Sequence, residues 1–105
     1  MTYKAPVNDI VFTLKHEAGF DRLVQSGAYP DLSDDLVDAI LDEAAKFADN
    51  IVAPLSWQGD QTGARLEDDG VKVPASFKEA YAKYVGSGWS TLAAPTDYGG
   101  QGLPL

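Results

Sequence analysis

The sequence predicts an all-α chain with a minor two-stranded hairpin. The chain has 105 residues, enough for one domain with a packed core. Apolar residues in 34–55 recur at steps of three and four, as on one face of an α-helix. The same spacing returns in 7–14 and 77–85, whereas a hairpin is predicted only within 64–73, around Asp69-Gly70.

The first 32 residues are predicted to be an N-terminal extension with a short helix. Residues 1–6 are expected to form an extended arm. A helix is expected from 7–14, and Gly19 ends or interrupts it. One further helical turn is expected at 20–24, followed by a loop at 28–32.

Residues 33–105 are predicted to form a helical domain that begins with the strongest helix of the chain. Ser33 or Asp34 caps its first turn, and Pro54 stops or kinks it near Val52. The wide apolar stripe indicates burial against several neighbours, which makes this helix a packing element. Its polar residues are expected mostly on the opposite face: Asp34, Asp35, Asp38, Asp42, Lys46 and Asp49.

After this helix, residues 57–63 are expected to be a turn-rich connection. A third helix is predicted from the capping-box pattern of Ser76 and Glu79. Gly86 and Gly88 provide its C-terminal stop.

Composition excludes several classes of function. The net charge of -8 and the pI near 4.3 argue against nucleic acid and anionic membrane surfaces as partners. The chain has no cysteine, so it has no disulfide and no thiolate metal site. No apolar run approaches the length of a membrane span, and the N-terminus lacks a signal-peptide core. We therefore expect a cytoplasmic protein.

No catalytic or metal site is predicted from the side chains. His16 is the only histidine and lacks the second histidine of a zinc-binding helix, so we expect it to be exposed. The acids Asp31, Asp34, Asp35 and Asp38 lack the spacing of a calcium loop and fit a helix start better. The acids of 67–69 are interpreted as a solvated turn.

The glycines near the end of the chain admit two interpretations. Gly99, Gly100 and Gly102 do not match a phosphate-binding loop, and Gly86-Ser87-Gly88 does not match a dinucleotide-binding turn. The backbone N–H groups of Gly99, Gly100 and Gly102 could form an anion-binding nest. A tight loop that only glycine permits is the favoured interpretation. In that loop, Gly99 or Gly100 is expected to have positive φ.

Three segments in the same order resemble the acyl-CoA dehydrogenase family. Residues 88–92 lead into a P-x-x-Y-G-G-x-G loop at 95–104, and 46–54 is similar to the first helix of that family's N-terminal domain. Residues 3–14 look like the N-terminal extension of a long bacterial branch that includes 3-methylmercaptopropionyl-CoA dehydrogenases. The residues that mark the signature loop are Tyr98, Gly99, Gly100 and Gly102.

The resemblance implies that this chain is the N-terminal part of an FAD-dependent oxidoreductase that introduces an α,β double bond into an acyl-CoA thioester. Family members are several-fold longer, and their catalytic glutamate would lie beyond this chain, so no catalytic residue is assigned here. FAD is expected in the full-length enzyme but not bound tightly by this chain. The expected partners are the remaining domains of the enzyme, the acyl-CoA substrate and further copies in a homo-oligomer.

Two alternatives stay open. One is a free-standing acidic helical module that binds a partner protein, since a wide apolar stripe serves that role equally well. The other is a small-molecule carrier with a cavity between its helices. The glycine loop favours the enzyme fragment, because a plain helical adaptor has little need for Tyr-Gly-Gly-Gln-Gly after its last helix.

Overall fold

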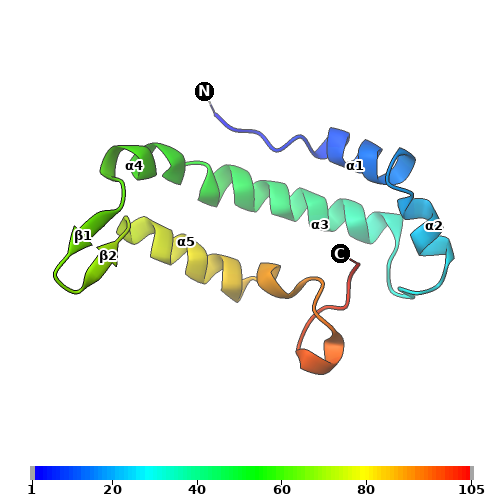
Figure 1. The fold of residues 1–105 in the computed structure, drawn as a ribbon. Helices are drawn as coiled ribbons and strands as arrows, with labels where there is room; N and C mark the ends of the chain where they lie inside the picture. Colours follow the sequence, from blue (N-terminus) through cyan, green and yellow to red (C-terminus); the bar gives the residue numbers. More distant parts are fainter. Residues whose placement is uncertain (1, 105) are drawn as a thin grey trace.

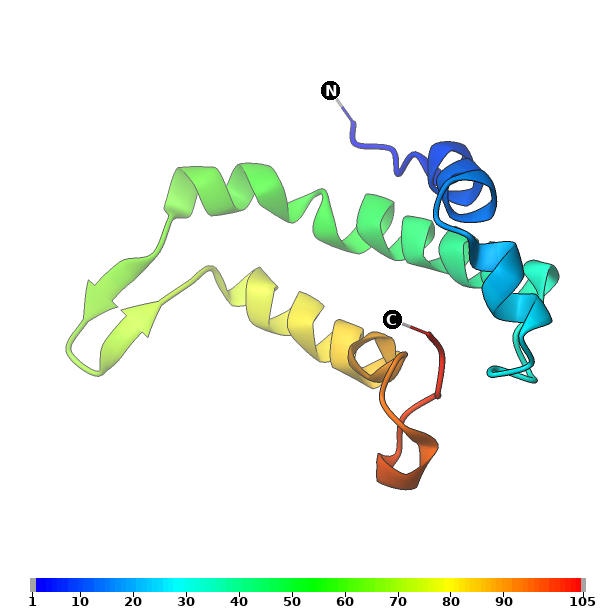
Figure 2. The ribbon, with the colours of Figure 1, turned by 45° about the vertical axis from the view of Figure 1, so that its right-hand side comes forward.

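The computed structural model describes residues 2–104 and shows a mostly helical chain with a two-stranded antiparallel hairpin (Figure 1). This confirms the predicted fold class. Figures 1 and 2 show α3 and α5 as antiparallel arms, joined at one end by α4 and the hairpin. The elements are α1 (Val7–His16), α2 (Phe20–Gln25), α3 (Asp34–Phe47), η1 (Ala48–Val52), α4 (Leu55–Thr62), β1 (Arg65–Glu67), β2 (Gly70–Lys72), α5 (Ala75–Gly86), η2 (Trp89–Thr91) and η3 (Thr96–Tyr98).

The N-terminal segment folds as its sequence predicts. The α1 helix begins at Val7, and Gly19, with a φ of 72°, makes the left-handed turn that separates it from α2. Glycine suits this position because it adopts positive φ without the steric cost of a Cβ atom. The predicted loop at 28–32 is also present, and α3 follows it.

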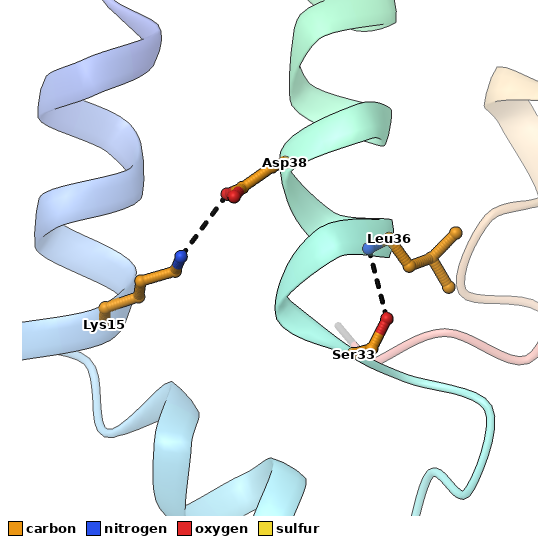
Figure 3. A network of polar contacts seen from close by, with 4 residues as sticks. All are labelled: Lys15, Ser33, Leu36 and Asp38. Carbon is orange, nitrogen blue, oxygen red and sulfur yellow. Dashed lines mark hydrogen bonds and ion pairs between the residues drawn. The ribbon is translucent and has the colours of Figure 1, made fainter.

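The α3 helix begins at a side-chain cap and continues at its end into a π-helix. The Ser33 hydroxyl oxygen accepts a hydrogen bond of 3.2 Å from the Leu36 N–H (Figure 3), which satisfies one of the free donors of the first turn. The segment Ala48–Val52 is a π-helix, closed by a 2.8 Å hydrogen bond from the Ala53 N–H to the Ala48 carbonyl. Pro54 has no N–H, and its ring would clash with the preceding turn of a regular α-helix, which accounts for the interruption. The predicted stop near Val52 is confirmed, but the π-helix was not predicted.

The prediction of a turn-rich connection at 57–63 was wrong, because the helix α4 occupies Leu55–Thr62. Pro54 directly precedes α4, in a region of a helix where a missing N–H costs nothing. Gly59 lies inside α4 because the helix packs closely on α5: a Cβ at Gly59 would lie 2.6 Å from Cζ of Phe77. Gly59 therefore serves a close packing contact.

The hairpin and the start of α5 each differ in detail from the prediction. Glu67 pairs with Gly70, so the two-residue loop is Asp68-Asp69, one residue earlier than expected. The prediction of a capping box at Ser76 and Glu79 was wrong, because Pro74 is the N-cap of α5 and no side chain caps the helix. The Ser76 hydroxyl instead donates a 2.7 Å hydrogen bond to Oε1 of Gln58 in α4.

The core lies where α2 and its loop meet the start of α3. Phe20, Leu32 and Val37 are buried there and form one apolar cluster. The segment after the glycine loop returns to this cluster through Leu103, as predicted. The partly buried side chains packed around it are Leu14, Val24, Tyr29, Leu41 and Leu103.

The chain is far more open than a self-contained domain of its size. Its radius of gyration is 17.3 Å, against about 13 Å for a compact chain of this length. Its accessible surface is 7871 Å², against about 5,700 Å² for a compact monomer of this mass. Much apolar surface is therefore left uncovered between and beyond the two arms. Within residues 2–104, no helix is both long and apolar enough to cross a bilayer.

Candidate functional site

The glycine loop is closed by its own backbone. Its N–H groups donate to carbonyls of the preceding segment: Gly99 to Thr96 (3.1 Å), Gly100 to Pro95 (3.0 Å), Gln101 to Thr91 (3.0 Å), Gly102 to Ala94 (2.9 Å) and Leu103 to Leu92 (3.0 Å). Because these donors are engaged, they are not available to an anion. The anion-nest interpretation is therefore wrong, and the tight-loop interpretation holds.

The glycines of this loop are required for different reasons. Gly99 and Gly102 have φ of 80° and 67°, so the predicted positive φ falls on Gly99. Gly100 has no positive φ, but a Cβ there would lie 2.0 Å from the Ala94 carbonyl oxygen. The backbone of Ala94 therefore leaves no space for a side chain at Gly100.

Two side chains of the loop, Gln101 and Tyr98, have different surroundings. The Gln101 amide donates a 3.0 Å hydrogen bond to the Gly88 carbonyl, which ties the loop to the end of α5. Tyr98 is 86% exposed, so its ring and hydroxyl are available to another surface. The loop therefore presents the aromatic side chain of Tyr98 at the surface.

The acids and the histidine of the sequence do not assemble into a site. The Lys15 ammonium lies 3.4 Å from Oδ1 of Asp38 and joins α1 to α3 (Figure 3). His16 is exposed, as predicted, and its ring lies 4.7 Å from the ring of Phe12. Within residues 2–104, no three histidine, aspartate or glutamate side chains are grouped to hold a metal ion. A hydrogen bond from Lys46 to Glu43 raises the pKa of Lys46, which stays cationic near neutral pH.

Asp49 is the one acidic side chain of the long helix that the sequence analysis misplaced. It was expected on the exposed face, but its side chain is only 15% exposed. Its Oδ1 accepts a 2.9 Å hydrogen bond from the Ala5 N–H, and its Oδ2 lies 3.7 Å from the Lys4 ammonium. Asp49 therefore fastens the N-terminal arm to η1, and periodicity gives no signal for such a contact.

A groove of about 370 Å³ with a mainly apolar lining lies between the two arms. It runs between the end of the first arm, from α3 to α4, and the facing side of α5. No charged side chain lines it. We call it the interarm groove; its lining residues are Phe47, Val52, Leu55, Ser56, Phe77, Ala80, Tyr81 and Tyr84.

Comparison with known proteins adds what the geometry alone does not. No protein-family model matches the sequence. A 3-methylmercaptopropionyl-CoA dehydrogenase from Ruegeria pomeroyi is 40% identical over 104 residues, which are 99% of this chain and 18% of that protein. A broad-specificity linear acyl-CoA dehydrogenase from Mycobacterium tuberculosis is 27% identical over 104 residues, which are 97% of this chain and 17% of that protein.

The curated homologues of this chain are acyl-CoA dehydrogenases. The resemblance drawn from residues 3–14, 46–54 and 88–104 is thereby confirmed. The chain spans less than a fifth of the length of these acyl-CoA dehydrogenases. Sequence reasoning found the loop but missed the interarm groove, because an apolar stripe does not tell which part of it stays uncovered.

Proposed function

We propose that this chain is the N-terminal helical part of an FAD-dependent acyl-CoA dehydrogenase that introduces an α,β double bond into an acyl-CoA thioester. The observation that carries the proposal is the 40% identity to the Ruegeria pomeroyi relative over 99% of the chain. The proposed division is an N-terminal extension, residues 1–32, and the start of the helical domain, residues 33–105. The extension packs against that domain through Phe20 and Leu32.

Within residues 2–104, the glycine loop does not fit the phosphates of a flavin. The N–H groups of the glycine loop are engaged by carbonyls, and the chain as a whole is acidic, with a net charge of -8. Flavin phosphates need free N–H groups or cations. We therefore propose that FAD and the catalytic base are held by other parts of the longer polypeptide, and that this chain supplies no reacting group.

The role proposed for this chain is to wall the substrate cavity and to pack between domains. Removal of an α-proton and transfer of hydride require a shaped site from which water is excluded. The open shape and uncovered apolar faces described above suit a part that is completed by neighbouring domains. Acyl-CoA as substrate, homo-oligomerisation and a cytoplasmic location remain part of the proposal.

The test is to express the longer polypeptide encoded around this chain and to add straight-chain and branched acyl-CoA thioesters without oxygen. Bleaching of the flavin absorbance by an acyl-CoA, with formation of the enoyl product, supports the proposal. The alternative is a free-standing acidic interaction module, which the exposed apolar groove favours. A reading frame that stops directly after Leu105 would support this alternative against the enzyme.

A further inference from the structure

We infer that η1 is a hinge between α3 and α4, and that the N-terminal arm, residues 2–6, locks this hinge. The lock is the contact of Ala5 with Asp49, which lies 44 residues further along the chain. The inference goes beyond the proposed function, because it concerns a conformational device of this chain and needs neither flavin nor substrate.

The backbone at η1 has the features of a hinge. The segment Ala48–Val52 is a π-helix, and single π-helical turns inside α-helices are rare and frequently lie at functional sites. The turn is closed by the 2.8 Å hydrogen bond from the Ala53 N–H to the Ala48 carbonyl, and Pro54 has no N–H to add an α-helical bond. Bending therefore breaks fewer hydrogen bonds at η1 than inside α3.

Asp49 ties this turn to a segment outside the long helix. Its Oδ1 accepts the 2.9 Å hydrogen bond from the Ala5 N–H. Because the Asp49 side chain is only 15% exposed, this bond to a carboxylate is partly shielded from water, which strengthens it. The Lys15 ammonium, 3.4 Å from Oδ1 of Asp38, fixes the other end of the same segment to α3. The segment thus holds Asp49, and the π-helical turn that contains it, in a set position relative to α3.

Figures 1 and 2 show this segment running back from α1 along α3 in the direction of α4. Its course brings residues near the start of the chain onto the point where the long helix changes its winding. The lock is therefore formed by the N-terminal extension, and it acts on the helical domain.

The angle at η1 matters because α5 contacts the chain on both sides of it. Before η1, the Phe47 ring lies 6.2 Å from the ring of Tyr84. After η1, Gly59 of α4 packs closely on Phe77. Since α5 is one continuous helix, both contacts form together only over a narrow range of hinge angles. The N-terminal arm is thereby coupled to the packing of α4 on α5 and to the interarm groove, whose wall includes Val52 of η1.

Amide hydrogen exchange of the full-length protein, measured by mass spectrometry of short peptides, tests this coupling. Ala5→Pro removes the donated N–H without changing η1, and Ala5→Gly is the matched control, because it keeps the N–H. We expect exchange at Ala53 and in α4 to rise about tenfold in Ala5→Pro and to stay within about twofold of wild type in Ala5→Gly. Exchange inside α3 should stay unchanged in both variants.

A second set of variants tests whether the arm acts through Asp49. Asp49→Asn keeps an acceptor oxygen for the Ala5 N–H, so exchange at Ala53 should remain closer to wild type than in Asp49→Leu. Adding Ala5→Pro to Asp49→Leu should raise the exchange no further, because the same hydrogen bond is already lost. Equal exchange in Ala5→Pro and Ala5→Gly, an equal rise throughout α3, or additive effects of Ala5→Pro and Asp49→Leu would each overturn the inference.

Discussion

The ring of Phe77 in α5 occupies the space where a side chain at position 59 of α4 would project. A Cβ at Gly59 would lie 2.6 Å from Cζ and 3.3 Å from Cε1 of that ring. This contact holds the two arms together beside the hairpin. It also explains a glycine in the middle of a helix, where glycine is otherwise unfavourable by about 1 kcal/mol relative to alanine.

The first prediction is that Gly59→Ala fails to stabilise the protein, although the change favours helix. The methyl group must displace the Phe77 ring, which we expect to offset the gain and to lower the free energy of unfolding by up to about 1 kcal/mol. In a Phe77→Ala background, Gly59→Ala should instead stabilise by about 1 kcal/mol. Urea unfolding of the four proteins measures this coupling, and equal effects in both backgrounds would show that the contact is unimportant.

The second prediction concerns the arm that Asp49 holds. Asp49→Ala removes the acceptor of the Ala5 N–H, and we expect faster hydrogen exchange at Ala5 and a loss of about 1–2 kcal/mol of stability. Lys4→Ala is the control, because Lys4 is 81% exposed and should contribute less than about 0.5 kcal/mol. Unchanged exchange at Ala5 in Asp49→Ala would mean that the arm is fastened elsewhere.

Neighbouring positions on α3 give the third prediction. Phe47 contacts Tyr84 and Trp89 across the arms, so Phe47→Asp places a carboxylate among apolar rings and should cost about 3 kcal/mol or more. Lys46 is 65% exposed, so Lys46→Asp should cost only about 0.5 kcal/mol. Thermal melts compare the two, and similar melting temperatures would contradict the orientation of α3 described above.

The fourth prediction separates two glycines of the signature loop. Gly99→Ala keeps enough space but strains a backbone with positive φ, at a cost of about 1–2 kcal/mol. Gly100→Ala places a methyl group on the Ala94 carbonyl and should break the hydrogen bond from Gly102, at a cost of about 2–3 kcal/mol. Denaturant unfolding should therefore rank Gly100→Ala as the more damaging, and the reverse order would show that strain outweighs contact in this loop.

The sequence predicted those features that depend on residues close together in the chain. The apolar spacing of 34–55, the Ser33 cap and the glycine turn at Gly19 are local, and each was found as expected. The signature loop was recognised for the same reason, since its residues are consecutive. Its internal hydrogen bonds could not be derived, because they depend on where the preceding backbone turns.

The features that the sequence missed depend on contacts between distant segments. Ser76 and Glu79 match a capping box, but the helix starts earlier, at Ala75, and Ser76 finds a partner on α4. The residues of α4 have the composition of a turn, yet packing against Phe77 favours helix. The helical spacing places Asp49 on the polar face, but in the structure the N-terminal arm covers it through the hydrogen bond from the Ala5 N–H. In each case tertiary contact overrides local preference.

We propose that this chain is the helical part of a flavoenzyme and that it holds no flavin by itself. The most direct measurement is the FAD content per polypeptide after gel filtration, for the longer polypeptide and for residues 1–105 prepared with excess FAD. We predict about one FAD per longer polypeptide, as expected for a single tight site, and none on the short chain. A short chain that retains stoichiometric FAD, or a folded longer polypeptide that binds none, would contradict the account.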